Sequence, residues 1–430
     1  MINNPFANCN TTRHLSRRTL LKGLGASGLT WLTPLSHSLA VEAEKKNAPA
    51  KSVIVLWMAG GPSQLETFDP HPNTAIAAGI GAIPTSIKGI QLAQGMPHTA
   101  EVMEHISLIR SVTSKEGDHE RASYNVKTGY RPNPSLKHPS IGAILSHQIP
   151  NPDIEIPTHI SILPDQWPAR GGYLGPEFDA FQVGDPTKSI PDVSSPVEQQ
   201  RHHSRLNSLS LLEKEFARGR LAQLETSKTL HQATIQKALQ MMNSDQIKAF
   251  DVNEATTTER AAYGDTPFGR GCLAARRLIQ TGVRCVEVTL NGWDTHVNNA
   301  EGQAKKIAIM DPAFAALIND LKARDMLKST VVLCGGEFGR TPKTNALDGR
   351  DHWPHGFSVA VAGGGFKGGH VMGSTDPTGV SQEPENPVKV EDIHATVQHL
   401  HGLEPDKELM TPVGRPMALS DGDVIEEIIS

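Results

Sequence analysis

Short apolar runs alternate with longer helix-forming segments along most of the chain. Residues 53–58 form a continuous apolar run that ends in two glycines and a proline. This pattern is typical of a strand that is buried on both faces of a parallel sheet. Five further apolar runs predict strands at residues 106–109, 160–163, 283–288, 331–334 and 357–362.

The helix-forming segments lie between these runs. Residues 204–250 contain no proline and little glycine, and they are rich in leucine, glutamine, lysine and glutamate, so they predict a helical insertion. Residues 268–280 predict a second helix, which stops at Gly282. Pro312 is predicted to begin a third helix, because proline suits the first turn. Its apolar stripe consists of Phe314, Leu317, Ile318 and Leu321.

A last helix is predicted around Ile393, Val397 and Leu400. Strands that alternate with helices predict an α/β fold, in which a mostly parallel central sheet is covered by helices on both faces. In such folds the functional residues lie at the carboxyl ends of the strands.

The first forty residues have the three parts of a secretory signal. Arg17 and Arg18 precede an apolar stretch at residues 23–35, and Ser38 and Ala40 offer small residues at a cleavage site. The alternative is a disordered basic tail, which does not explain this order. We therefore expect a twin-arginine signal at 1–40, a linker at 41–51 and one α/β domain at 52–430, exported by the twin-arginine machinery to the periplasm or cell envelope.

Charge and cysteine content narrow the class of protein. The formal net charge is −5, which gives no basic footprint for nucleic acid, and no segment predicts a stable membrane span. Once the signal is removed, Cys272, Cys285 and Cys334 remain, each in an apolar or helical stretch. We expect buried thiols rather than a disulfide framework.

Four groups of polar residues follow predicted strands, and the first is Asp294 with His296. Two residues apart on an extended backbone, they point the same way, and a carboxylate with an imidazole suits zinc or a similar divalent metal. The alternative is a helix-capping aspartate beside an incidental histidine. The second group consists of Glu337 and Arg340, which lie between glycines. Flanking glycines let the backbone approach a ligand closely, and the alternative is a plain ion pair between the two side chains.

The third group spans residues 349–355 and combines Arg350 with an aspartate and two histidines. Arginine suits a phosphate or sulfate group because its planar fork donates two hydrogen bonds at once. The fourth group is the charged turn at residues 118–121, with His119 and Arg121. Surface loops carry such mixtures by chance, but all four groups follow strand ends of one predicted sheet.

The order of these strands and loops resembles the alkaline phosphatase and sulfatase superfamily over most of the chain. In closer detail it is similar to an exported, sulfatase-like family known only as a domain of unknown function (family 1501). The motifs that carry this resemblance lie at residues 60–64 with 67–70, at 293–296, at 337–342 and at 349–353.

The resemblance implies a metal site. Asp294, His296 and His352 match the residues that hold one metal in the superfamily, with zinc as the expected ion and calcium or magnesium as alternatives. The second-metal positions differ, because Glu337 replaces an Asp-His pair and glycine replaces the first aspartate, for which Glu66 or Asp69 could substitute. Asp351 is a further candidate ligand.

The usual nucleophile position, ten residues before the glycine of a Thr-Gly pair, falls on His119. A histidine there could attack phosphorus, activate water or hold a metal.

Together these features predict an exported metal-dependent hydrolase of small anionic phosphate or sulfate esters. The alternative is a catalytically degenerate metal- or anion-binding protein of the cell envelope with the same fold. The candidate catalytic residues are His119, Arg340 and Arg350. The candidate substrate-binding residues are Arg121, Ser63 and His355.

Overall fold

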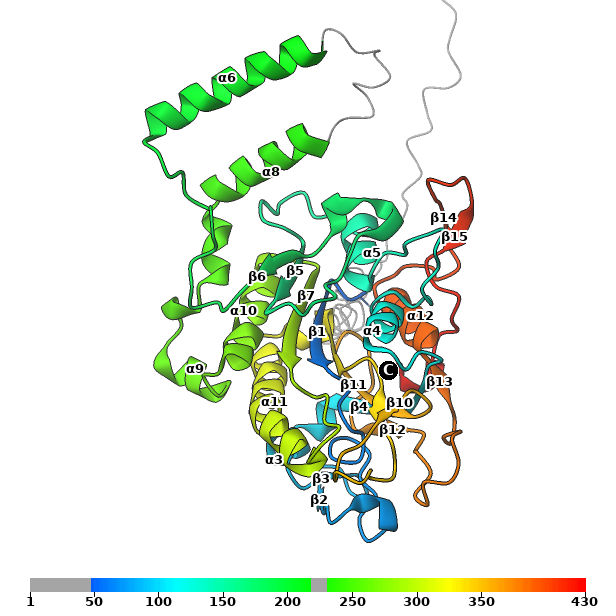
Figure 1. The fold of residues 1–430 in the computed structure, drawn as a ribbon. Coiled ribbons are helices and arrows are strands. Elements are labelled where there is room, and N and C mark those ends of the chain that lie inside the picture. Colours follow the sequence, from blue (N-terminus) through cyan, green and yellow to red (C-terminus); the bar gives the residue numbers. More distant parts are fainter. Residues whose placement is uncertain (1–47, 218–229) are drawn as a thin grey trace, which may run out of the picture. The chain divides into compact units, whose positions relative to one another are not determined.

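A nine-stranded sheet runs through the centre of the computed structural model, which describes residues 48–217 and 230–430 (Figure 1). The strand order is β12-β4-β11-β8-β1-β7-β5-β6, and β13 also pairs with β4. Within this sheet only β11 runs antiparallel to its neighbours. The predicted fold class, a mostly parallel α/β sheet, is therefore confirmed.

The bounds of the elements follow the predicted runs closely. The sheet consists of β1 (Ser52–Ala59), β4 (Ile106–Thr113), β5 (His159–Ile162), β6 (Phe181–Val183), β7 (Cys285–Asn291), β8 (Thr330–Gly335), β11 (Phe357–Ala362), β12 (His370–Met372) and β13 (Val388–Lys389). Two-stranded ribbons are formed by β2 (Ala82–Pro84) with β3 (Gln91–Ala93), β9 (Gly339–Arg340) with β10 (His352–Trp353), and β14 (Glu408–Met410) with β15 (Pro416–Ala418).

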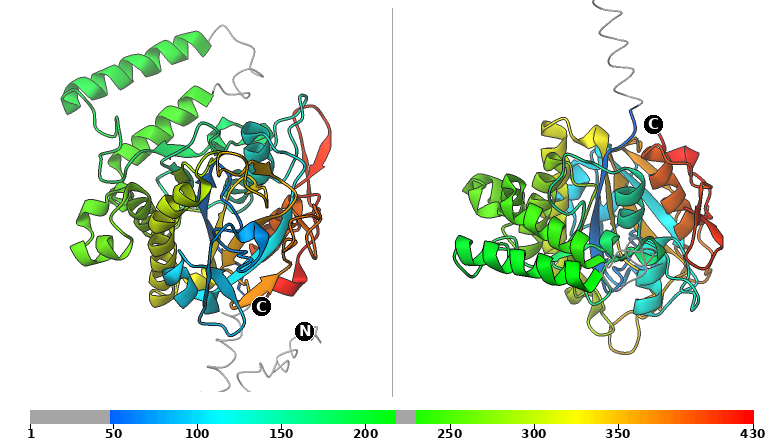
Figure 2. Two further views of the ribbon diagram at one scale, coloured as in Figure 1. Left: turned by 60° about the horizontal axis from the view of Figure 1, so that its bottom comes forward. Right: turned by 90° about the horizontal axis from the view of Figure 1, so that it is seen from above.

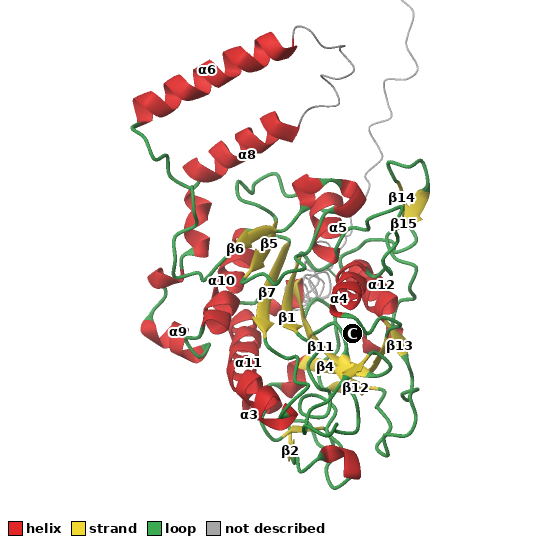
Figure 3. Cartoon of the chain, viewed as in Figure 1, coloured by secondary structure: helices red, strands yellow, loops and turns green. Residues whose placement is uncertain are grey.

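Helices alternate with the strands along the chain, as the sequence pattern predicts (Figure 3). They are α3 (Pro97–Glu101), α4 (His119–Thr128), α5 (Ile141–Gln148), α6 (Gln199–Ala217), α8 (Leu230–Asn243), α9 (Thr257–Ala262), α10 (Pro267–Thr281), α11 (Asn299–Ala323) and α12 (Val390–Leu400).

Both faces of the sheet are covered by helices. Successive side chains of a strand point to opposite faces, so β1 contributes residues to two different cores. Ile54, Leu56 and Met58 of β1 belong to the core that includes α10 and α11. Val53 belongs to a second core, which includes residues of α5 and α12. Figure 2 shows α10 and α11 on one side of the blue β1 strand and the orange α12 on the other. Each such buried side chain contributes roughly 1.5–3 kcal/mol, so the two cores fix the position of β1.

Two predicted helices differ from those observed. Pro312 does not begin a helix but lies inside α11, which starts thirteen residues earlier at Asn299. A proline inside a helix costs about 3 kcal/mol. Met310 and Phe314 are fully buried on either side of it, and this packing outweighs the cost. The segment predicted as helical at residues 204–250 forms α6 and α8, followed by a 3-10 helix at Asp245–Phe250.

The predicted signal at residues 1–40 lies outside the described residues, as does most of the predicted linker at 41–51. The end of that linker is already fixed, because Ala50 is buried and its N–H donates to the carbonyl of Leu400 at 2.8 Å. Cys272, Cys285 and Cys334 are free and buried, as expected. In the part of the chain that the structure describes, no helix is both long enough and apolar enough to span a bilayer.

Candidate functional site

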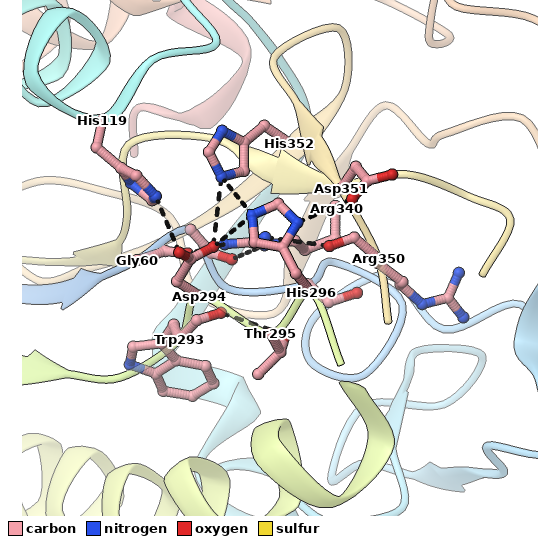
Figure 4. Close-up of polar contacts among 12 residues, drawn as sticks. Gly60, His119, Trp293, Asp294, Thr295, His296, Arg340, Arg350, Asp351 and His352 are labelled. Atoms are coloured by element: carbon pink, nitrogen blue, oxygen red, sulfur yellow. Dashed lines mark hydrogen bonds and ion pairs between the residues drawn. The ribbon is translucent and has the colours of Figure 1, made fainter. Parts of the chain in front are cut away.

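Three side-chain atoms converge at the carboxyl ends of the strands. Asp294 Oδ1 lies 3.0 Å from His296 Nε2 and 3.3 Å from His352 Nε2, and the two nitrogens are 3.0 Å apart (Figure 4). Asp294 and His296 follow β7, whereas His352 stands on the β9–β10 ribbon, opposite Arg340. The sequence prediction placed these three residues together, and the fold does bring them into contact.

The two histidines are held so that their Nε2 atoms face each other. His296 Nδ1 donates to Asp351 Oδ1 at 2.8 Å, and His352 Nδ1 donates to the carbonyl of Gly117 at 2.8 Å. A neutral imidazole has one N–H, so both Nε2 atoms then present lone pairs to each other and to the Asp294 carboxylate. Three acceptors this close require a cation between them, which is either a proton or a metal ion.

His119 contacts the other carboxylate oxygen of Asp294, Oδ2, whereas His296 and His352 contact Oδ1. Asp118 caps α4 by accepting from the N–H of Arg121 at 3.2 Å, so His119 is the first residue of the helix. Its Nδ1 donates to Glu337 Oε1 at 2.7 Å, and its Nε2 lies 3.4 Å from Asp294 Oδ2. Hydrogen bonds to Asp294 and Glu337 raise the pKa of His119 to about 9, against the effect of burial.

His119, Asp294 and His352 also form a group that could hold a metal ion, with ligand atoms within 4.8 Å of one another. This group shares Asp294 and His352 with the triad that includes His296. We call these four residues, His119, Asp294, His296 and His352, the histidine cluster.

Glu337 stands behind the histidine cluster instead of joining it. The side chain is buried, and its Oε1 accepts from the N–H of Gly60 at 2.9 Å as well as from His119. Its Oε2 has no hydrogen-bond partner among the described residues. Gly60 has φ +113°, and a Cβ there would lie 2.5 Å from the Asp294 nitrogen. Gly60 therefore lets β1 and the loop after β7 approach each other.

Arg340 is fully buried and holds Asp294 in place. Its Nη2 donates to Asp294 Oδ1 at 2.7 Å, while its other donors bind carbonyls of Gly60, Gly61 and Arg350. Burial opposes ionisation of Asp294, but hydrogen bonds from His119 and Arg340 outweigh it and place the pKa of Asp294 well below its usual range. The prediction of Arg340 as a catalytic residue that contacts the substrate is not supported, because its guanidinium is fully buried and bonded to the protein itself.

The third polar group also divides differently from the prediction. Arg350 is fully buried and binds Glu66 Oε1 at 3.1 Å and the carbonyl of Ile76 at 2.8 Å, so it is a structural residue and not an anion-binding one. Asp351 is exposed and contacts His296 Nδ1, on the side of the ring that faces away from the cluster. It therefore holds the orientation of the His296 ring from the side away from Asp294 and His352.

The three predicted substrate-binding residues lie in three different surroundings. Ser63 is fully buried, and its N–H donates to Gln303 Oε1 at 3.1 Å, so it cannot meet a substrate. His355 packs against Trp353 in a separate surface hollow. Arg121 is half-exposed on α4 and forms a bidentate pair with Glu116. Of these predictions only Arg121 lies on the element that carries His119.

Two aromatic residues of the site were missed by the sequence analysis. Phe338 stacks on His352 with ring centroids 4.4 Å apart, and Trp167 stacks on His119 at 6.1 Å. Trp167 follows β5, at the same edge of the sheet as the histidine cluster. The rule that functional residues follow the carboxyl ends of parallel strands could have found it.

The family described as "Protein of unknown function (DUF1501)" matches residues 50–429 of this chain. No curated protein matches it. Among solved structures, that of Ps i-CgsB is similar with a TM-score of 0.41 and 10% identity, covering 83% of this chain and 72% of that chain. The PsFucS1 sulfatase from Pseudoalteromonas sp. gives a TM-score of 0.38 and 13% identity, covering 89% of this chain and 72% of that chain. A mutant of TAB5 alkaline phosphatase with Mg bound gives 0.36 and 12%, covering 83% and 99%. Likenesses this weak carry no argument about the site.

Proposed function

The chain belongs to the DUF1501 family of proteins of unknown function, and we propose that it is an exported, metal-dependent hydrolase of phosphate or sulfate esters. The observation that carries this proposal is the convergence of Asp294 Oδ1, His296 Nε2 and His352 Nε2 within 3.0 to 3.3 Å of one another. Two ligands that are each about 2.0–2.1 Å from a tetrahedral zinc ion lie about 3.3 Å apart. The three atoms therefore have the spacing that one zinc ion needs.

The residues around the triad fit a metal site as well. Ligating histidines usually donate their second N–H to a carboxylate or a carbonyl, as His296 does to Asp351 and His352 to Gly117. Three protein ligands leave a fourth position open for water or substrate, which is typical of catalytic zinc sites. A bound zinc ion would polarise an ester oxygen and lower the pKa of a bound water.

His119 is the residue that we place at the open side of this site. Glu337 fixes its Nδ1, so its Nε2 faces the cluster 3.4 Å from Asp294 Oδ2. In this position it would carry a proton to or from the reacting ester. Arg340 would keep Asp294 ionised and correctly turned, and Phe338 would support the ring of His352.

One observation favours the second candidate, a metal- or anion-binding protein of the cell envelope without turnover. The expected nucleophile position holds His119 and not a serine, threonine or cysteine. In addition, the guanidinium groups of Arg340 and Arg350 are buried and bonded to the protein itself. No arginine of the described site is thus free to hold the anion of an ester.

The two candidates separate in one experiment on protein purified without chelator. Metal content is measured first, and hydrolysis of 4-nitrophenyl phosphate and 4-nitrophenyl sulfate is measured next, for wild type and His119→Asn. The hydrolase proposal expects equal metal content, and kcat at least about 100-fold lower in the variant. Metal without any hydrolysis supports the binding protein. Absence of metal contradicts the hydrolase and leaves only the anion-binding form of the second candidate.

Export is the part of the proposal that rests on sequence alone. Replacing Arg17 and Arg18 by lysine should stop export, because lysine lacks the planar fork of the two guanidinium groups. The measurement is the amount of cleaved protein outside the cytoplasm. Normal amounts of cleaved, exported variant would refute this pathway.

A further inference from the structure

A second hollow lies along α4, next to the histidine cluster. Its volume is about 660 Å³, and Trp167 is part of its wall. The same Trp167 ring stacks on His119, with an angle of 11° between the planes. Because Trp167 stacks on His119 and also lines the hollow, the hollow and the histidine cluster are neighbours.

The wall of this hollow offers groups that suit a polar ring. Tyr124 and Trp167 supply aromatic surface on the two sides of α4. Ser123 is buried, and its Oγ has no hydrogen-bond partner among the described residues. Buried hydroxyls normally have a partner, so an unpaired one in the wall of a hollow indicates that a ligand or a water supplies it.

Charge varies along the hollow. Asp118 and Glu120 lie beside His119 at the start of α4, whereas Lys137 lies near Tyr124, with its ammonium 6.0 Å from that ring. Tyr124 is five residues along the helix from His119, which is about 7.5 Å. Lys137 is exposed and has no carboxylate within ion-pair distance among the described residues. The ammonium group of Lys137 thus lies close enough to the histidine cluster for a short oligosaccharide to reach both.

We propose that this hollow binds the part of the substrate beyond the reacting ester and that the substrate is an acidic oligosaccharide. A sugar ring packs on Trp167 and Tyr124, and a second anionic group meets Lys137. This inference rests on the proposed hydrolase function for the identity of the reacting end, but the binding itself does not depend on turnover.

Isothermal titration calorimetry on the full mature protein tests it. The probes are a heparin-derived sulfated tetrasaccharide and the neutral cellotetraose, and the variants are Lys137→Ala and Lys137→Glu. We expect the sulfated probe to bind more tightly than cellotetraose. We also expect Lys137→Ala to weaken the sulfated probe about fivefold, the upper range for one exposed ion pair, and Lys137→Glu to weaken it further. The matched control is Lys88→Ala, an exposed lysine between β2 and β3, which should keep the wild-type affinity.

Equal binding of the two tetrasaccharides, or unchanged affinity in both Lys137 variants, would overturn the inference. Failure of the proposed function looks different. A protein that binds the sulfated probe through Lys137 but hydrolyses no aryl ester contradicts the hydrolase and keeps the hollow. A protein that hydrolyses aryl esters but binds the sulfated probe independently of Lys137 keeps the hydrolase proposal and contradicts the role of the hollow.

Discussion

Two groups of charged and polar side chains lie near the sheet, and they differ in whether every charged or polar atom has a partner within the protein. In the histidine cluster, the acceptor atoms of Asp294, His296 and His352 lie 3.0 to 3.3 Å from one another, and His296 is 43% exposed. The second group, which we call the lysine network, consists of Lys127, Asp165 and Glu287. Its lysine Nζ lies 3.0 Å from Glu287 Oε1 and 3.5 Å from Asp165 Oδ1, and all three side chains are buried.

The lysine network contains its own cation, and further bonds complete it. Trp57 Nε1 donates to Asp165 Oδ2 at 2.8 Å, and Ser161 Oγ donates to Glu287 Oε1 at 3.1 Å. Buried charges that are paired and hydrogen-bonded in this way maintain structure. The histidine cluster is only partly complete. His119 and Arg340 supply positive charge to Asp294, but the Nε2 lone pairs of His296 and His352 face each other at 3.0 Å, and His296 is open to solvent. Under the proposed function, a metal ion from outside would occupy the space between these two nitrogen atoms and Asp294, whereas the lysine network needs no added ion.

Removing one ligand should have the largest effect. His352→Ala should lose most of the bound metal, whereas His355→Ala, in the same loop but in a separate hollow, should keep the wild-type content. A metal present at about 1,000 times its Kd stabilises the folded protein by about 4 kcal/mol. Chelator should therefore lower the Tm of wild type and leave the Tm of His352→Ala unchanged. Equal metal content in folded wild type and His352→Ala would show that the metal assignment is wrong.

Breaking the lysine network should cost stability without changing the metal. Lys127→Met leaves two buried carboxylates unpaired, and removing one partner of a buried ion pair typically costs about 3–5 kcal/mol. The free energy of unfolding from urea titration measures this loss, with Lys88→Met as the exposed control. Metal content should stay at the wild-type value. A loss below about 1 kcal/mol would mean that the network does not depend on its lysine.

Acid should weaken the core around the lysine network. Burial lowers the pKa of both His159 and His394 to about 4 from 6.5 in the unfolded chain. Below pH 6.5 the unfolded chain binds more protons, so stability is complete above 6.5 and is lost as pH falls towards 4. The expected loss at pH 5 is about 2 kcal/mol for each histidine. His394→Gln should remove about half of this dependence, measured by urea titration at pH 7 and pH 5. Replacing the exposed His203 by glutamine should not change it, and a wild-type slope in His394→Gln would contradict the assignment.

The sequence was a good guide wherever one physical signal decided the outcome. Apolar runs located β1, β7, β8 and β11, and the resemblance to the superfamily grouped Asp294, His296 and His352, which the fold brings into contact. The motif resemblance could not tell that Arg340 and Arg350 are buried. A guanidinium that binds backbone carbonyls has the same sequence signal as one that binds an anion. The partners that decide between them, such as Gly61 and Ile76, are distant in sequence.

Pro312 and the lysine network show that a sequence pattern also cannot predict packing between distant residues. The pattern around Pro312 fits a helix start, and only the burial of Met310 and Phe314 shows that α11 continues through it. Lys127 lies in an ordinary helical stretch, and its partner Glu287 is 160 residues away. Contacts between such distant residues depend on the completed sheet, so periodicity and composition could not predict them.

The smallest expected effect concerns Asp351, which touches the cluster only through His296. Its carboxylate accepts from His296 Nδ1 at 2.8 Å and thereby keeps the Nε2 lone pair turned towards Asp294. Asp351→Asn preserves the size of the side chain but removes the charge, and such second-sphere changes typically lower metal affinity about 10- to 100-fold. We expect a value near 10-fold, because Asp351 is 57% exposed and water can replace part of the interaction. Competition with a chromophoric zinc chelator measures the Kd, with Asp348→Asn in the same loop as the control. Metal content at saturating zinc should stay unchanged, because all three proposed ligands remain. A variant that loses the metal altogether would mean that Asp351 is itself a ligand, as the sequence first suggested, and a variant with wild-type affinity would mean that His296 needs no carboxylate to hold its orientation.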